Sequence, residues 1–256
     1  MKKLMFAAAA AFCGTVFALE SANIVGYNST AIAGGKLSCI SLQFADVGGE
    51  GDVASLGKLA SAGLTAGIYD TMNTDAPCIM VYNGVGYDYY YYISDAFDAD
   101  GNEVTAWADL NGDEIDVTED LGTGFWLNVP AATCSTGTLT QSGEVSDAAT
   151  STINIAAGLT LAGNPYPAAI NMSKVVTTGL VAGIYDTMNT DAPCIMVYNG
   201  VGYDYCYYIS DAFDADGNEV TAWADLNGDA IDGEIAEAGE AFWARSSTAG
   251  ALTFSL

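Results

Sequence analysis

The feature that most constrains this chain is a long internal repeat. Residues 66–113 read AGIYDTMNTDAPCIMVYNGVGYDYYYYISDAFDADGNEVTAWADLNGD, and residues 182–229 repeat them with one change, Tyr90 to Cys206. Whatever structure this segment forms, the chain must form it twice. The spacing of the copies leaves about 110–120 residues for each, an ordinary size for one domain. The sequence therefore predicts two homologous domains in tandem.

The flanks of the repeat diverge but still correspond. Residues 124–126 (GFW) align with 241–243 (AFW), and residues 137–140 align with 250–253. We expect a first domain over residues 23–145 and a second over 146–256. A nearly identical centre with divergent ends favours a duplicated binding or structural module over an enzyme whose site is shared between two specialised halves.

Within each copy the residue pattern predicts β-structure. Residues 78–82 are an apolar run, residues 83–86 (NGVG) are typical of a turn, and residues 87–94 return with side chains alternating between two faces. Further short strands are expected at 104–108, 125–129 and 137–141.

The predicted fold class is accordingly all-β. Closely spaced short strands with Gly, Asn and Asp turns indicate two β-sandwich or partly closed barrel-like domains. Each domain is expected to hold at most one short helix, at Val53 to Ala62 in the first and at Ala168 to Thr177 in the second.

Residues 1–22 have the pattern of a secretory signal peptide. Lys2 and Lys3 precede an apolar run from Leu4 to Phe17, and small residues favour cleavage after Ala18, with Ala22 as the second choice. The run is too short for a comfortable membrane span, and no second apolar segment follows, so no transmembrane segment is predicted. We expect an exported protein, placed outside the cell, at its surface or in the periplasm.

The charge balance excludes whole classes of partner. Removal of the signal peptide takes away Lys2 and Lys3. The mature chain then has 4 basic and 32 acidic residues, a formal charge of −28. A nucleic-acid binder needs clustered Lys and Arg, so no nucleic-acid partner is expected, and anionic lipid is disfavoured. The chain has no histidine, which removes every mechanism that relies on imidazole.

Removal of the signal peptide leaves an odd number of cysteines, so at least one thiol is free or pairs with another molecule. Cys39 and Cys134 are placed so that a bridge could tie the ends of the first domain, and small buried thiols are an equal alternative. No Cys-x-x-Cys spacing occurs, which argues against a zinc or redox site.

Two acidic loops in each copy are the candidate metal sites. Alternating oxygen side chains in a Gly-containing loop suit calcium, which takes six to eight oxygen ligands. The candidate ligands are Asp98, Asp100, Asn102, Asp109, Asn111 and Asp113, repeated as Asp214, Asp216, Asn218, Asp225, Asn227 and Asp229. The match to a calcium loop fails further along, where Glu114 replaces the turn glycine, so any site is expected to be weak. The alternative is that these carboxylates close turns and keep the surface soluble.

Tyrosine is concentrated in the two copies. Both faces of the strand at residues 87–94 carry tyrosines, so one face is a candidate platform for a sugar ring or another protein, with Tyr90, Tyr92 and Tyr208 as candidate contacts. The alternative is that these rings pack within the fold. The four tryptophans are expected to anchor cores rather than to contact ligands.

An enzyme is not expected. Carboxylate pairs can hydrolyse glycosides, but acidic residues are so abundant here that some pair always appears suitable. No Gly-rich phosphate loop precedes a helix, and a Ser-His-Asp triad is impossible without histidine.

Three short motifs carry a resemblance. The chain resembles a loose group of uncharacterised, exported, β-rich bacterial proteins through residues 21–27 (SANIVGY), 163–167 (GNPYP) and 239–243 (GEAFW). The first domain has Leu42-Gln43-Phe44 where the second has Asn164-Pro165-Tyr166, so the GNPYP turn is not shared. The resemblance implies secretion and a β fold, and transfers no site residues.

These observations predict a secreted, non-catalytic structural, cell-surface or adhesive protein, with weak calcium sites as an option. The alternative is a carbohydrate-binding module that uses the Tyr-rich strands, and a carboxylate-based glycoside hydrolase is a remote third. Glycans or other surface proteins are the expected partners. The sequence does not indicate an oligomeric state.

Overall fold

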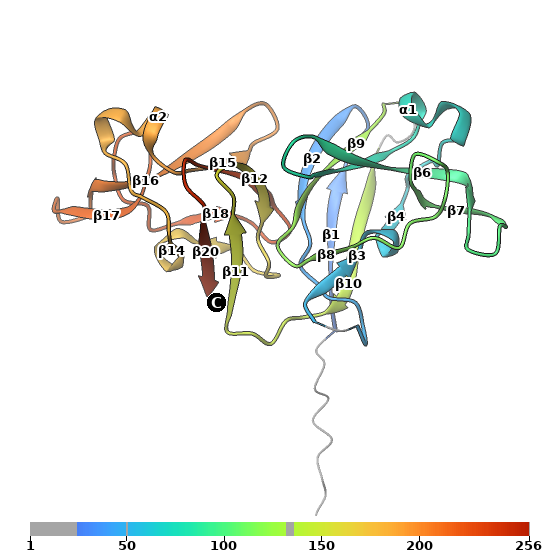
Figure 1. The fold of residues 1–256 in the computed structure, drawn as a ribbon, viewed down its shortest axis with the longest axis horizontal. Helices are drawn as coiled ribbons and strands as arrows, with labels where there is room; N and C mark the ends of the chain where they lie inside the picture. The colour runs from blue at the N-terminus through green and yellow to red at the C-terminus, as the bar shows by residue number, and fades with distance from the viewer. Residues whose placement is uncertain (1–24, 50, 132–135, 256) are drawn as a thin grey trace, which may run out of the picture.

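The computed structural model describes residues 25–49, 51–131 and 136–255 (Figure 1). The expected leader at 1–22 and Cys134 lie outside these ranges. Domain 1 contains β1–β10, and its elements are β1 (Val25–Ile32), β2 (Lys36–Ser41), β3 (Val53–Ser55), η1 (Leu56–Lys58), β4 (Ala60–Ala62), η2 (Tyr69–Thr71), α1 (Met72–Asp75), β5 (Cys78–Tyr82), β6 (Tyr87–Phe97), β7 (Glu103–Ala108), β8 (Thr118–Asp120), β9 (Gly124–Val129) and β10 (Gly137–Glu144).

Domain 2 repeats this series. Its elements are β11 (Thr150–Ile155), β12 (Gly158–Gly163), β13 (Ile170–Asn171), η3 (Met172–Lys174), β14 (Val176–Thr178), η4 (Tyr185–Thr187), α2 (Met188–Asp191), β15 (Cys194–Tyr198), β16 (Tyr203–Phe213), β17 (Glu219–Ala224), β18 (Glu234–Ala236), β19 (Ala241–Ser246) and β20 (Gly250–Ser255). Each strand of domain 2 is the counterpart of the strand ten numbers before it.

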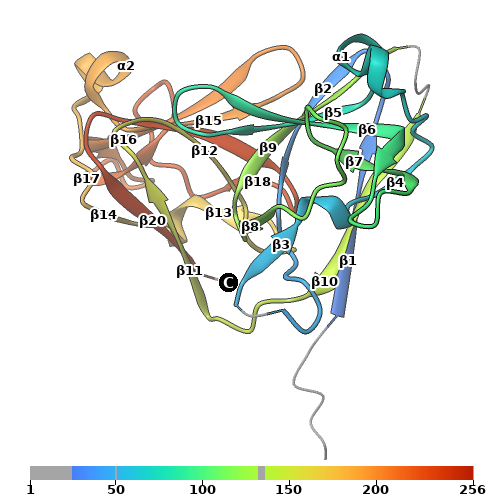
Figure 2. The same cartoon turned by 45° about the vertical axis from the view of Figure 1, so that its right-hand side comes forward.

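The sheets follow the same order in both domains. Domain 1 has a five-stranded antiparallel sheet β2-β9-β5-β6-β7, a three-stranded sheet β1-β10-β4 and a pair β3-β8; domain 2 has β12-β19-β15-β16-β17, β11-β20-β14 and β13-β18. Figures 1 and 2 show the two domains side by side, with α1 and α2 at opposite outer ends. The all-β prediction is confirmed, and the grouping of the strands into two equivalent sets of sheets is consistent with the predicted two domains.

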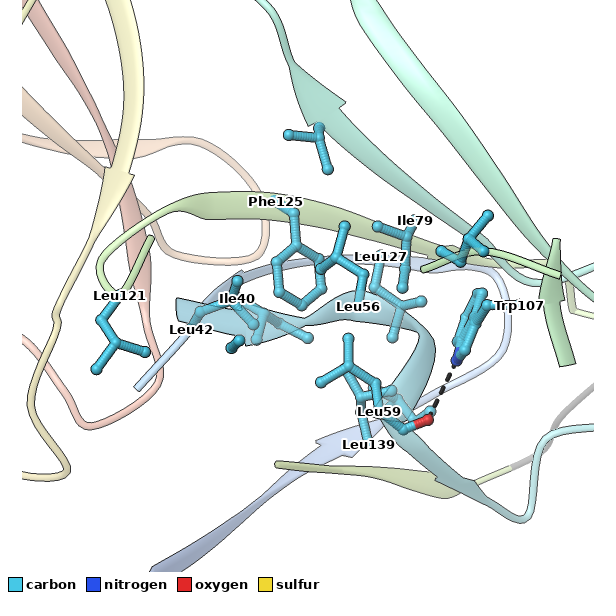
Figure 3. Close-up of a cluster of buried hydrophobic side chains, with 14 of the residues drawn as sticks. Ile40, Leu42, Leu56, Leu59, Ile79, Trp107, Leu121, Phe125, Leu127 and Leu139 are labelled. Carbon is cyan, nitrogen blue, oxygen red and sulfur yellow. Dashed lines mark hydrogen bonds between the residues drawn. The ribbon is translucent and has the colours of Figure 1, made fainter. Parts of the chain in front are cut away.

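One buried cluster joins the two larger sheets of domain 1 into a sandwich (Figure 3). Leu139 comes from the three-stranded sheet, whereas Ile79, Phe125 and Leu127 come from the five-stranded sheet, and all four are buried. Trp107 lies beside them and donates its Nε1–H to the carbonyl oxygen of Leu59 at 3.2 Å. Apolar burial of this kind is the main favourable contribution to folding.

The predicted strands of the repeat are confirmed, because local alternation and turn chemistry suffice to define them. β5 has the expected bounds, and β6 runs three residues further than expected, to Phe97. The expected turn joins them: Asn83 Oδ1 accepts hydrogen bonds from the main-chain N–H groups of Val85 and Gly86. Gly84 has φ +93°, a conformation that favours glycine.

The predicted helices at residues 53–62 and 168–177 are wrong. Residues 53–62 form β3, a single 3₁₀ turn and β4, and residues 170–178 form β13, a 3₁₀ turn and β14. Leu56 and Leu59, three residues apart, are both buried, which imitates the face of a helix. Here the 3₁₀ turn between two short strands produces the same spacing. The α-helices lie instead at α1 and α2, inside the repeat.

Candidate functional site

A cluster of aromatic and sulfur-containing side chains joins the two domains. Its buried members are Trp126 from β9, Leu161 from β12 and Trp243 from β19. The side chains packed around them are Cys39, Met80, Tyr82 and Tyr87 of domain 1 and Met196, Tyr198 and Tyr203 of domain 2. We call this set the interdomain cluster. It occupies the place where two five-stranded sheets approach each other.

The interdomain cluster is reciprocal. Tyr82 of domain 1 meets Trp243 of domain 2 edge-to-face, with ring centroids 4.9 Å apart. The equivalent pair in the opposite sense, Tyr198 of domain 2 and Trp126 of domain 1, has centroids 5.2 Å apart. Equivalent residues therefore exchange equivalent contacts, which is the geometry of a two-fold interface between copies. Edge-to-face geometry is favoured by the aromatic quadrupole.

Main-chain hydrogen bonds cross the same boundary in matched pairs. The N–H of Ser41 donates to the carbonyl oxygen of Gly239 at 2.9 Å, and the N–H of Gly163 donates to that of Gly122 at 2.8 Å. A Cβ added at Gly163 would lie 2.3 Å from the Ser41 side chain, so the close approach requires glycine there. The bonds connect the sheet edges β2 and β12 to the partner domain.

Buried polar side chains complete the boundary. Ser41 Oγ donates to the carbonyl oxygen of Asn164 at 2.8 Å, and Gln43 Nε2 donates to the carbonyl oxygen of Tyr166. Ser41, Gln43 and Asn164 are each fully buried. The sequence shows that residues 42–44 and 164–166 differ, but not that the two segments contact each other in the fold. The signal was a glutamine inside an apolar stretch.

The acidic loops are closed by their own hydrogen bonds. Asp98 Oδ1 accepts from the N–H groups of Asp100 and Asn102 at 2.9 and 2.8 Å, and Asn102 Nδ2 donates to Asp98 Oδ2 at 3.0 Å. The side-chain amide and the N–H of Asn102 lower the pKa of Asp98. Asp109 closes the second loop in the same way: its Oδ1 accepts from the main-chain N–H groups of Asn111 and Asp113 at 2.8 and 3.1 Å.

The second domain repeats these loops closely. Asp214 accepts from Asp216 and Asn218, and Asp225 accepts from Asn227 and Asp229. The main chains of the two loops of a domain run together, since the N–H of Phe97 donates to the carbonyl oxygen of Gly112 at 2.9 Å. Within the described ranges, no three acidic, cysteine or histidine side chains gather as a metal site would require.

The three candidate tyrosines pack toward the cores of their own domains. Tyr92 lies against Trp107 with ring centroids 5.3 Å apart, and Tyr208 lies against Trp223 at 5.4 Å. Tyr90 is half-buried against the core of domain 1, and its counterpart Cys206 is buried in domain 2. Other tyrosines of the same strands, Tyr87 and Tyr203, take part in the interdomain cluster instead.

Each domain carries a groove at an equivalent place, between its η-turn and the acidic loops. The groove of domain 1, about 540 Å³, is lined by residues that include Lys58, Asp98 and Asp116. The groove of domain 2, about 550 Å³, is lined by residues that include Tyr208 and Trp223. Of the three tyrosines predicted to contact a ligand, Tyr208 lines one of these grooves, whereas Tyr90 and Tyr92 line neither.

The four cysteines in the described part of the chain, Cys39, Cys78, Cys194 and Cys206, are free thiols. Burial raises the pKa of Cys78 and of Cys206 to about 12, and that of Cys194 to about 11. A thiol held protonated in this way is a poor nucleophile and a poor metal ligand. These cysteines act as small packing residues in the sheets.

In the part of the chain that the structure describes, no helix has the length and apolar character needed to cross a membrane. Comparisons with protein-family models, with curated proteins and with solved structures find no match to this chain. A function for the molecule therefore rests on the geometry of the interdomain cluster, the acidic loops and the two grooves.

Proposed function

We propose that the protein is an exported, non-catalytic structural or adhesive component of the cell surface, built as one rigid two-domain body. The observation that carries this proposal is the reciprocal packing of Tyr82 on Trp243 and Tyr198 on Trp126. Large aromatic side chains contribute most to packed interfaces, and here they join the domains rather than face solvent. A rigid body without a hinge suits a spacer or a surface module.

The acidic side chains support the same role. Asp98 and Asp109, with their counterparts in domain 2, are used as acceptors that close turns. A strongly negative, turn-rich surface keeps an exported protein soluble. Melting the protein with and without calcium is the measurement that decides whether these loops also bind calcium weakly.

Export is supported by the Lys2-Lys3 start and the apolar run that follows. The experiment is expression of the full chain in a bacterial host, followed by fractionation and N-terminal sequencing. We expect the protein outside the cytoplasm, with an N-terminus directly after Ala18 or Ala22. A variant with Lys2 and Lys3 changed to Glu is the control and should stay in the cytoplasm. Cytoplasmic retention of the natural chain with an intact leader would contradict the proposal.

A separate measurement tests whether the two domains form one rigid body. Small-angle scattering from the mature chain should fit a single rigid particle, because the interdomain cluster is buried. The double variant Trp126→Ala, Trp243→Ala should give the broader distance distribution of two bodies on a linker. A natural chain that already scatters as two independent bodies would overturn the rigid-body role.

Carbohydrate binding is the second candidate, and one observation favours it. The groove of domain 2 places Tyr208 and Trp223 together in its lining, beside hydroxyl and carboxylate side chains. Aromatic rings combined with a few polar groups are typical of small-molecule sites.

A further inference from the structure

The two grooves differ in whether the indole N–H of an equivalent tryptophan is hydrogen-bonded. In domain 1 the Nε1–H of Trp107 donates to the carbonyl oxygen of Leu59 at 3.2 Å. In domain 2 the equivalent Trp223 is only 4% exposed, and its Nε1–H has no partner among the residues that the structure describes. Val175 stands at the position of Leu59, and its carbonyl makes no such bond. A buried donor without an acceptor is rare and needs an explanation.

The residues that line the two grooves also differ between the domains. Trp223 and Tyr208 line the groove of domain 2, whereas Trp107 and Tyr92 do not line that of domain 1. Val175 and Ile231 add apolar surface beside the two rings in domain 2. The domain 2 groove is therefore lined by aromatic and aliphatic side chains, and one of them, Trp223, carries a buried hydrogen-bond donor without a partner.

Polar groups at the same groove accept hydrogen bonds. Asp214 and Asp232 contribute carboxylates, and Thr221 contributes a hydroxyl. A ligand for this set has to accept a hydrogen bond from the indole N–H and donate hydrogen bonds to carboxylates. A hydroxyl group does both. An anion would meet two carboxylates on a chain of formal charge −26, and a simple ammonium has no acceptor for the indole.

We propose that the groove of domain 2 binds a neutral saccharide. A sugar ring supplies apolar C–H faces for Tyr208 and Trp223, and its hydroxyls pair with the Trp223 N–H, Thr221 and Asp232. Because the indole nitrogen is shielded from solvent, binding includes a small movement of residues 172–177, which border the groove. The groove of domain 1, whose tryptophan N–H is already bonded, does not bind the same ligand. This proposal deepens the second candidate function, carbohydrate binding, and rests on it, but it does not depend on the structural role.

The experiment uses the mature protein, labelled with ¹⁵N, and follows the indole N–H signals of its 4 tryptophans. The probes are cellopentaose, maltopentaose, mannopentaose and chitopentaose, each added at millimolar concentration, with an oligogalacturonate as the acidic control. We expect at least one neutral probe to shift the Trp223 signal. The Trp107 signal should not move, and the oligogalacturonate should shift neither.

The repeat provides matched control variants. Thr221→Val and Asp232→Asn remove polar groups at the domain 2 groove, while Thr105→Val and Asp116→Asn make the same changes in domain 1. We expect each domain 2 variant to weaken binding of the neutral probe about tenfold, the effect of one lost hydrogen bond, and the domain 1 variants to leave it unchanged. Trp223→Phe should abolish the shifted signal and weaken binding at least as much.

Three results would overturn the proposal. One is a Trp223 signal that no neutral probe shifts, which would mean that no neutral saccharide reaches the indole N–H. Another is equal weakening by the domain 1 and domain 2 variants, and the third is binding of the oligogalacturonate as tight as that of the neutral probes. Each variant is checked for unchanged thermal unfolding, so that a folding defect is not mistaken for lost binding. None of these results bears on export or on the rigid interdomain cluster.

Discussion

Trp126 and Trp243 are the residues whose side chains connect the two domains most directly. Each is buried and touches a tyrosine of the other domain. We expect Trp126→Ala to lower the free energy of unfolding by about 3–5 kcal/mol, because it removes buried apolar area and leaves a cavity. Urea unfolding followed by circular dichroism measures the loss.

Val85→Ala is the matched control, because Val85 is 97% exposed at the tip of the β5–β6 turn. Its change should be within about 0.5 kcal/mol. Equal effects of the two substitutions would show that the interdomain cluster does not stabilise the fold.

Asp98 links charge to loop structure at the residue scale. Hydrogen bonds from Asn102, first from its side chain and then from its N–H, lower the pKa of Asp98 below the ordinary value of 3.8. Because the folded value is the lower one, the loop stabilisation is present above pH 3.8 and is lost as pH falls through the folded pKa. Carboxyl NMR titration of the mature chain should find this low midpoint. In Asn102→Ala the midpoint should rise toward 3.8, and an unchanged midpoint would contradict the assignment.

At the scale of the element, the acidic loops behave as closed turns. Each leading aspartate accepts two main-chain N–H groups through Oδ1 and an asparagine side-chain amide through Oδ2. We expect calcium in the millimolar range to change the melting temperature of the mature chain by less than about 1 °C relative to a chelator. Differential scanning calorimetry measures this. A rise of several degrees, abolished in Asp109→Ala but not in Asp88→Ala, would establish a calcium site instead.

The elements also show where local sequence patterns are reliable. The β5–β6 hairpin was predictable because strand alternation and the Asn83–Gly86 turn are both local signals. The segment from β3 to β4 was not, because the buried pair Leu56 and Leu59 has the same spacing in a 3₁₀ turn as on a helix. Only the pairing of β3 with β8 and of β4 with β10 separates the two interpretations.

At the scale of the whole molecule, the interdomain cluster should couple the unfolding of the two domains. We expect one calorimetric transition for the mature chain, with equal calorimetric and van't Hoff enthalpies. The double variant Trp126→Ala, Trp243→Ala should show two transitions, because each domain retains its own buried core. Two transitions in the natural chain would mean that the domains are energetically independent.

The candidate sites could be predicted only in part. The residues of the acidic loops were identified from their spacing, but their use as turn-closing acceptors depends on which N–H groups the folded loop presents. The alternation pattern predicts a platform that includes Tyr92 and Tyr208, whereas in the structure each packs against a core tryptophan. The pairing of Ser41 with Asn164 joins residues more than a hundred positions apart, and no local pattern contains it.

The sequence by itself determined the fold class and the duplication. Strand alternation, turn residues and a repeated segment are patterns of residues that are close together in the chain, so they can be recognised without the tertiary structure. It also determined the charge, and from that charge we expect no nucleic-acid partner. Tertiary structure alone decided which tyrosines join the domains, which line a groove, and that Trp223 lacks the partner that Trp107 has. The nearly identical segments differ in this way because the residues outside them differ: the carbonyl of Leu59 accepts from Trp107, whereas that of its counterpart Val175 does not accept from Trp223.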